Sequence, residues 1–382
     1  MTIESERAHV ASDDAEVDRE RADVSDRSAR FTAGGIVVGT LAVLVVVALL
    51  PTLWGAVSSM GAPQWLEALA IGLLFVPAAV GVYITFRVLD FPDLTVDGSF
   101  PAGGAIAAML ITSDVSPWLA LPAAMLLGAA LGVVTGCLHI YLRVNSLLAS
   151  IITLTAAFTV NLRVQGSANI SLLNSDRIFG LWIEPIRNRL EDWFGAAGVQ
   201  VHRAVTTASM TVLIVIVMLL VLRWFFATEV GLGLRATGAN REMSQSQGIN
   251  TARYLIGGVA VSNALVGLSG ALFVQHAGFA DINSGSGLIV SGLAAVIIGE
   301  VLFGSKARSM TTKFIAVGLG MLAYRVAIAL ALNADLRFPG TDGFRLEASD
   351  IKLATAAVVV AMLALPRFRE SRKERARRRA RT

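Results

Sequence analysis

The amino-acid sequence predicts an all-α protein, a polytopic membrane helix bundle of about ten crossings arranged as two inverted five-helix repeats with broken helices. Hydrophobic residues make up 55% of the chain and charged residues only 16%, with a mean hydropathy of +0.66. Soluble domains usually carry about a quarter charged residues. Apolar runs of roughly 20 residues, long enough to cross a bilayer, recur along the chain. Segments of about ten residues that alternate between apolar and polar side chains, as in a membrane β-barrel, do not recur along the chain.

The apolar runs define the expected helices and the organisation of the chain. Uninterrupted crossings are expected at 34–54, 65–86, 118–139, 146–163, 206–226, 255–274, 314–332 and 351–365. In two further segments, 86–112 and 276–306, irregular polar backbone precedes a short apolar helix that begins near Ala102 or Gly287. A half-length helix behind polar backbone is typical of a broken membrane segment. The domain division is therefore a disordered arm at 1–32, a transmembrane domain at 33–366 and a basic tail at 367–382.

Lysine and arginine predict the orientation, because cytoplasmic loops carry an excess of both. The basic tail is placed in the cytoplasm, and counting back along the crossings places the hydrophilic loop 228–254 inside. The loop 164–205 falls outside. Both termini are then cytoplasmic.

The two irregular segments resemble each other. They align without gaps with identities at Phe91/Phe279, Asp93/Asp281, Gly104/Gly292 and Ala107/Ala295. The first segment is the third crossing and runs outward, whereas the second is the eighth and runs inward, so the halves are predicted to be inverted repeats. In transporters of this plan the solute path lies near the repeat interface. The candidate pathway residues are Asp93, Asp97, Ser99, Gly104, Asp281, Asn283, Gly292 and Glu300.

These residues also have structural interpretations. Asp93 and Asp97 can hold the broken backbone by accepting N–H bonds, or can lie at the interface as helix caps. The glycines can serve close helix packing. Glu300 can form a salt bridge with Arg325, or both side chains can extend separately toward the interface.

The loop 228–254 is the most informative stretch. Its sequence GLGLRATGANREMSQSQGINTARY places a short helical stretch, about 240–247, between glycines. A short helix on the cytoplasmic face can dock in a groove of a partner and convert the partner's motion into helix movement. The pattern GLxLRAxGxN followed by GIN resembles the coupling loop of ABC permeases of the branched-chain amino acid and ribose type. The segment FRVLDFPDLTVDGSFPAGGA resembles a subgroup encoded with periplasmic-type binding lipoproteins, some of them linked to aromatic amino acids.

The resemblance extends over about residues 66–365 and implies the permease subunit of an ABC importer in the plasma (inner) membrane of a bacterium. Two permease chains, as a homodimer or heterodimer, would form the pore between ABC ATPase subunits inside and an external solute-binding protein that delivers a small solute such as an amino acid. No cofactor is expected on this chain. The residues implied to contact or shape the ATPase interface are Leu234, Arg235, Ala236, Gly238, Asn240, Gly248, Ile249 and Asn250.

Other functions find less support. The nearest match to a phosphate-binding loop, 299–306, reads Gly-Ser-Lys where the motif requires Gly-Lys-Ser/Thr, so ATP hydrolysis is expected on another subunit. The histidines and the single Cys137 lack metal-ligand spacing. The basic tail follows a membrane helix, which favours contact with membrane lipid over nucleic acid. An ion-coupled secondary transporter with inverted repeats is the main alternative, but such a carrier does not need a docking loop. A channel is the third hypothesis, and no ring-forming motif for its selectivity constriction is evident.

Overall fold

The computed structural model describes residues 61–173, 175–183, 187–303, 309–333, 335–336 and 344–345. All of them belong to one compact unit, Gly55–Leu363. The predicted arm 1–32, the first and last predicted crossings, and the basic tail lie outside the described residues.

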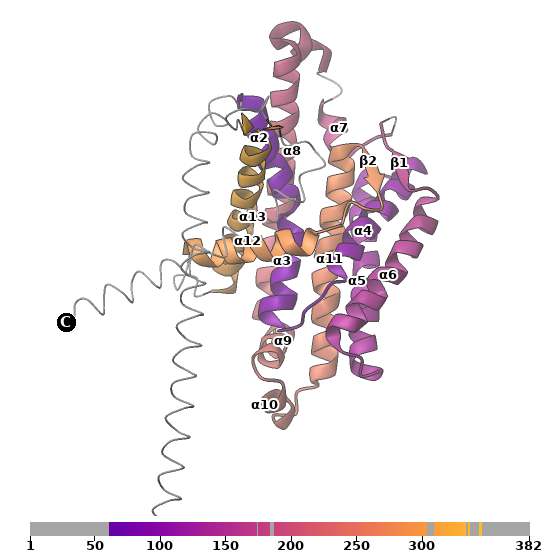
Figure 1. The fold of residues 1–382 in the computed structure, drawn as a ribbon, viewed down its shortest axis with the longest axis vertical. Coiled ribbons are helices and arrows are strands. Elements are labelled where there is room, and N and C mark those ends of the chain that lie inside the picture. Colours follow the sequence, from indigo (N-terminus) through magenta and orange to yellow (C-terminus); the bar gives the residue numbers. More distant parts are fainter. Residues whose placement is uncertain are drawn as a thin grey trace, which may run out of the picture. The chain divides into compact units, whose positions relative to one another are not determined.

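The described part of the chain is almost entirely helical, as predicted (Figure 1). In chain order the helices are α2 (Ala62–Leu74), α3 (Val76–Tyr83), the π-helical turn η1 (Ile84–Val88), α4 (Val96–Thr112), α5 (Pro117–Tyr141), α6 (Ser146–Gln165), α7 (Ile178–Ile183), α8 (Arg187–Ala227), α9 (Glu229–Ala239), α10 (Arg241–Ser246), α11 (Thr251–Ala277), α12 (Leu288–Phe303) and α13 (Met310–Asn333). The strands are β1 (Asn169–Ser171), β2 (Phe279–Asp281), β3 (Asp335–Leu336) and β4 (Phe344–Arg345).

Six helical stretches within the described residues are long and apolar enough to cross a membrane. They are Pro63–Val88, Pro117–Tyr141, Ser146–Gln165, Val199–Ala227, Thr251–Ala277 and Met310–Ala331, and each corresponds to a predicted crossing. Helices α4 and α12 are shorter apolar helices. The described residues therefore form a polytopic helical membrane protein, and the total of ten crossings stays a prediction.

The first broken segment comprises the non-helical residues 89–95 between η1 and α4. Asp90 takes φ 52°, a left-handed conformation in which aspartate is enriched. Helix α4 begins at Val96, so the expectation of a start near Ala102 was wrong. Pro101 lies inside α4, where it cannot donate to the carbonyl of Asp97. Gly285 packs against that carbonyl instead, since a Cβ on Gly285 would lie 2.0 Å from its oxygen.

The second broken segment begins where α11 ends at Gly278, with φ 81°. Strand β2 follows and pairs antiparallel with β1 in the register Asn169↔Asp281, Ile170↔Ala280, Ser171↔Phe279. Gly287, with φ 83°, precedes α12, as expected. The predicted external connection 164–205 is not a loop throughout, because it contains β1, α7 and the first part of α8.

Packing between the two halves follows the pattern of a repeat. Helix α11 packs against α4 and α5, and correspondingly α3 packs against α12 and α13. Helices α3 and α11 also pack on each other. In this contact Ser262 Oγ donates to Gly81 O and Ser269 Oγ donates to Leu74 O, both over 2.7 Å. The offset of the sequence repeat exchanges these two residue pairs, which is the relation expected of a pseudo-two-fold axis between α3 and α11.

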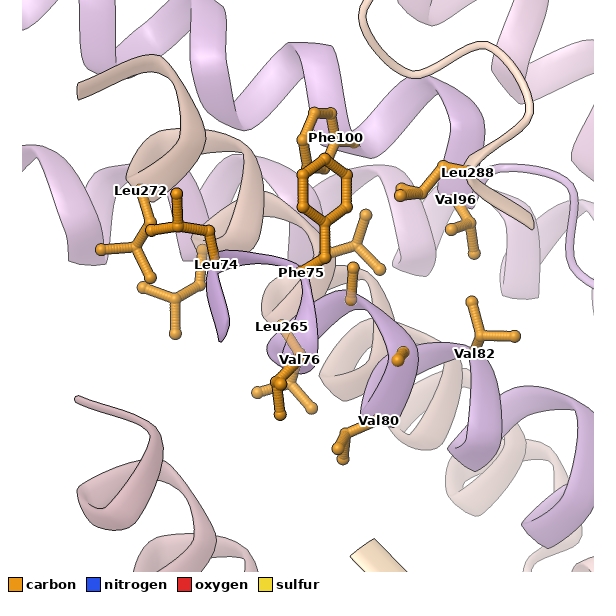
Figure 2. Close-up of a cluster of buried hydrophobic side chains, with 14 of the residues drawn as sticks. Leu74, Phe75, Val76, Val80, Val82, Val96, Phe100, Leu265, Leu272 and Leu288 are labelled. Carbon is orange, nitrogen blue, oxygen red and sulfur yellow. The ribbon is translucent and has the colours of Figure 1, made fainter. Parts of the chain in front are cut away.

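The apolar core lies where these helices meet (Figure 2). Side chains at the junction of α2 and α3 gather with others from α4, α11 and α12. The rings of Phe75 and Phe100 stack with centroids 5.2 Å apart, and the Phe273 ring lies across Phe75 at 5.4 Å. Helix α12 packs across α3 (Figure 1).

Candidate functional site

The predicted docking helix is present as α10, and polar side chains fix its ends. Asn240 Oδ1 accepts the Met243 N–H over 2.9 Å and so caps α10. Asn250 Oδ1 accepts the Arg253 N–H over 3.2 Å at the start of α11. Between them Gly248 has φ 78°, a left-handed conformation that favours glycine. Asn240, Gly248 and Asn250 therefore shape the loop through its backbone.

The other residues of the predicted ATPase interface differ in exposure. Arg235, Asn240, Gly248 and Asn250 are exposed, whereas Ala236, Gly238 and Ile249 are half-buried. Leu234 is only 2% exposed, so it can shape a docking surface but cannot form one. Helix α10 is mostly exposed, with Met243 at 63%, at the end of the long helices opposite to β1 and β2 (Figure 1).

Helix α9 occupies a stretch whose glycines lower helix propensity, and the sequence did not predict it. Those glycines instead allow close approach. A Cβ on Gly231 would lie 2.4 Å from backbone atoms of α8, and one on Gly233 would lie 2.5 Å from the Tyr254 ring on α11. A Cβ on Gly238 would lie 1.8 Å from Val88 O at the end of η1.

Through Gly238, α9 rests on the beginning of the first broken segment. The next residue, Leu89, continues this contact and is 2% exposed. A Cβ on Gly258 would lie 2.7 Å from the Leu89 side chain and 2.9 Å from the Leu234 side chain, so α9, α11 and residue 89 pack closely together. A displacement of α9 toward η1 would therefore also displace the backbone at residues 88–89.

Asp93 ties the first broken segment to α11. Its carboxylate is fully buried and accepts the Thr95 N–H over 2.9 Å and the Asn263 Nδ2 N–H over 2.7 Å. Ser99 Oγ of α4 donates to Asn263 Oδ1 over 2.7 Å. A buried carboxylate is costly unless it is hydrogen-bonded, and these bonds offset that cost. Asp93 and Ser99 thus hold the broken segment and α4 on Asn263.

Asp97 bridges the two halves of the repeat. Its Oδ2 accepts the Gly287 N–H over 3.1 Å and its Oδ1 accepts the Ile289 N–H over 2.8 Å. The Gly287 amide directly precedes α12 and the Ile289 amide lies in its first turn, where N–H groups have no partner within the helix. Asp97 therefore caps the short helix of the other half, in addition to the contact between its carbonyl and Gly285. Asp97 thus accepts N–H bonds from the backbone of a broken segment, which is one of the two roles predicted for it. The segment is the second one, before α12, and not the one before its own helix α4.

Asp281 and Asn283 repeat the local structure of Asp93 and Thr95. The Asp281 Oδ1 accepts the Asn283 N–H over 2.9 Å, at the positions that the sequence repeat makes equivalent. Both broken segments therefore contain the same turn, in which an aspartate caps the backbone two residues on. Gln165 at the end of α6 donates to Ala280 O over 2.7 Å and fixes β2.

The paired glycines of the short helices make equivalent contacts. A Cβ on Gly104 would lie 2.7 Å from the Val274 side chain and 3.6 Å from Gly270 O on α11. A Cβ on Gly292 would lie 2.8 Å from the Val82 side chain on α3. Residues 82 and 270 are themselves equivalent in the repeat. Gly104 and Gly292 thus serve close helix packing, one of the two roles expected for them.

The salt bridge considered between Glu300 and Arg325 is not formed. Glu300 pairs with Arg87 at the end of η1, and both side chains are about half exposed, at 43% and 52%. The Arg325 guanidinium lies 3.7 Å from the centroid of the Phe75 ring, a cation–π contact in the interior of the bundle. Arg325 therefore does not extend toward the membrane–water interface, which was the second possibility considered for it.

Sequence reasoning missed Asn263, Arg87 and His139, which the structure brings to this region. An amide in the middle of the apolar run 255–274 was a signal for Asn263, because a buried amide needs partners. No comparable signal marked Arg87 or His139. Within the described residues, no group of three or more His, Cys, Asp and Glu side chains is placed to hold a metal ion.

Comparison with known proteins relates this chain to permease components of transport systems. Residues 64–336 match the profile of the family described as "Branched-chain amino acid transport system / permease component". The chain is 34% identical over 286 residues to the tyrosine transport system permease protein of Clostridioides difficile (strain R20291), covering 75% of this chain and 85% of that protein. It is 28% identical over 233 residues to the ribose import permease protein RbsC of Escherichia coli (strain K12), covering 60% of this chain and 67% of that protein. The chain has no significant match among solved structures.

Proposed function

The chain belongs to the family of permease components of branched-chain amino acid transport systems, the branched-chain and ribose type of ABC permeases, and from this premise we propose how it transports its solute. It is a multi-pass inner-membrane protein and the transport subunit, not an enzyme, of an ABC importer. In our proposal ATPase subunits dock on α10, an external binding protein delivers a small amino acid-like solute at the opposite end, and the solute crosses between two permease chains. Both chain termini are cytoplasmic.

The observation that carries the proposal is the exposed, capped helix α10 and its connection to the first broken segment. Helix α10 is joined to α9 at Asn240, and α9 packs through Gly238 on the backbone of Val88. A partner that moves α10 can therefore move the start of a broken membrane segment. A loop that only connected two crossings would not need these close contacts.

The proposed mechanism is alternating access driven by ATP on the partner subunits. Closure of the ATPases displaces α10 and α9, and the contact at Val88 transmits the displacement to residues 89–95. Because Asp97 of α4 is bound to the start of α12, α4 and α12 shift together. The coupled shift of both short helices opens the path to one side while it closes the other.

An amino acid is the solute class that we propose, because the 34% identical relative is named as a tyrosine transport permease. The more distant relative is named as a ribose permease. A competition assay distinguishes the two classes: uptake of a labelled aromatic amino acid by vesicles that contain the complete system should be reduced by unlabelled amino acids and not by ribose. The reverse pattern would contradict the amino acid assignment.

The docking site is tested by purifying the tagged chain from its native membrane in mild detergent and quantifying the co-purifying ATPase. Met243→Glu adds a charge to the exposed surface of α10 and should abolish the association. Leu173→Glu is the matched control, since Leu173 is 71% exposed and closely follows β1 in the sequence. Strand β1 lies at the end of the long helices opposite to α10 (Figure 1). Equal ATPase recovery with Met243→Glu and with the unchanged chain would contradict docking on α10. Uptake by the chain alone on an ion gradient would instead support the secondary-transporter alternative.

A further inference from the structure

His139, near the end of α5, contacts three segments that are separate in the sequence. Its Nδ1 lies 2.8 Å from Val144 O, in the turn that leads to α6. Its ring meets the Phe91 ring edge to face, with centroids 5.3 Å apart at 76°. Its Nε2 lies 3.5 Å from Arg241 Nη1 on α10. One imidazole thus joins the proposed docking helix to the first broken segment.

The two hydrogen-bonding contacts select one tautomer of the His139 ring. A carbonyl only accepts, so Nδ1 must carry the proton and donate to Val144 O. In the neutral ring Nε2 then has a free lone pair, which accepts an N–H from the Arg241 guanidinium, itself only a donor. The neutral Nδ1–H tautomer satisfies both hydrogen bonds at once.

The partners of His139 have opposite surroundings. Phe91 is 1% exposed, its N–H donates to Thr85 O over 2.9 Å, and it lies two residues before the buried Asp93. Arg241 is exposed on α10. His139 therefore reaches from a surface helix to the residue that anchors the broken segment in the core. This contact is independent of the one that α9 makes through Gly238.

We propose that His139 is a positioning residue that transmits displacement of α10 to the first broken segment through Phe91. The inference rests on the proposed function. The exposed part of this link is the contact between His139 and Arg241. It lies at the upper limit of hydrogen-bond distance and adds little stability. Loss of the His139–Arg241 contact should therefore affect the transmission of movement from α10 more than it affects the stability of the fold.

The test uses the complete system of permease, ATPase subunits and binding protein in proteoliposomes, with ATP hydrolysis and solute uptake measured on the same sample. His139→Phe keeps a ring beside Phe91 and removes both ring nitrogens, and Arg241→Ala removes the donor from α10. Each should leave the amount of assembled complex unchanged and lower uptake per ATP hydrolysed about fivefold or more, the lower end of typical coupling effects. The double variant should be no worse than either single one, since both remove the same link.

Arg223→Ala is the matched control, because Arg223 is exposed on α8, outside the loop 228–254, and its replacement removes the same charge without a contact to His139. It should retain the uptake-to-ATP ratio of the unchanged chain. If His139→Phe does not assemble, Arg241→Ala alone decides. An unaltered ratio with Arg241→Ala and with any assembled His139→Phe complex overturns the inference while the proposed function stands. Absence of ATP-driven uptake with the unchanged chain removes the proposed function, and the inference with it.

Discussion

Replacement of Gly238 by alanine tests the contact between α9 and the first broken segment. A Cβ at this position would lie 1.8 Å from Val88 O and 2.9 Å from Leu89 Cα. Ordinary contact begins at 3.4 Å, so α9 must withdraw from η1 by about 1.6 Å to accommodate the methyl group. Overpacking of this kind costs about 1–3 kcal/mol, and the better helix propensity of alanine offsets about 0.5–1 kcal/mol of it.

We therefore expect Gly238→Ala to fold with a net loss of about 1–2 kcal/mol and to transport poorly, because α9 is shifted from its native position against residues 88–89. Thermal unfolding in detergent measures the first effect and ATP-driven uptake in proteoliposomes the second. Gly257→Ala is the control, since Gly257 lies in α11 and a methyl group there would have no neighbouring described atom within 4 Å. Stability and uptake equal to those of Gly257→Ala would refute the role assigned to Gly238.

Three further predictions concern the bridge between the halves. Asp97→Ala removes the cap of α12 and should cost about 1–2 kcal/mol, seen as faster hydrogen exchange of the first α12 amides, with unchanged exchange as the contrary result. Glu300→Gln should change stability by less than about 1 kcal/mol, because its pair with Arg87 is half exposed, and a larger shift of the unfolding midpoint would contradict this. Ser262→Ala and Ser269→Ala should destabilise by similar amounts, about 0.6 kcal/mol each, as equivalent contacts of a two-fold arrangement. Clearly unequal unfolding midpoints would argue against that equivalence.

The positions of the helices could be predicted because a membrane leaves the backbone few choices. Every backbone group in lipid must be satisfied internally, so a long apolar run is almost necessarily a helix. The start of α4 and the whole of α9 were missed for a common reason. Pro101 and the glycines of α9 disfavour a helix locally, but close contacts with Gly285, Tyr254 and Val88 stabilise it. Tertiary packing of this kind is not encoded in the local pattern.

The candidate site was predictable where it depends on neighbours in the sequence. Asn240 and Asn250 cap the helices that directly follow them, so α10 could be located from the sequence. The partner of Asp97 lies in the other half of the chain, and only the three-dimensional arrangement brings it to α12. The partner of Glu300 likewise depends on the inclination of α12, which places the side chain beside Arg87 and away from Arg325.

The meeting of Asp97 with Gly285 makes the two halves unequal. The alignment of the two repeats makes positions 97 and 285 equivalent. The two residues therefore face each other across the pseudo-two-fold axis. Two carboxylates there would repel each other, and two glycines would leave both short helices without the bridge. With one of each, α12 receives a cap from α4, while the side chain of Thr95, the N-cap residue of α4, accepts no N–H from the start of α4. The two short helices are therefore not interchangeable: α12 is fastened to α4 near its first turn, and position 285 cannot take over the role of Asp97, because a Cβ there would lie 2.0 Å from the carbonyl oxygen of residue 97.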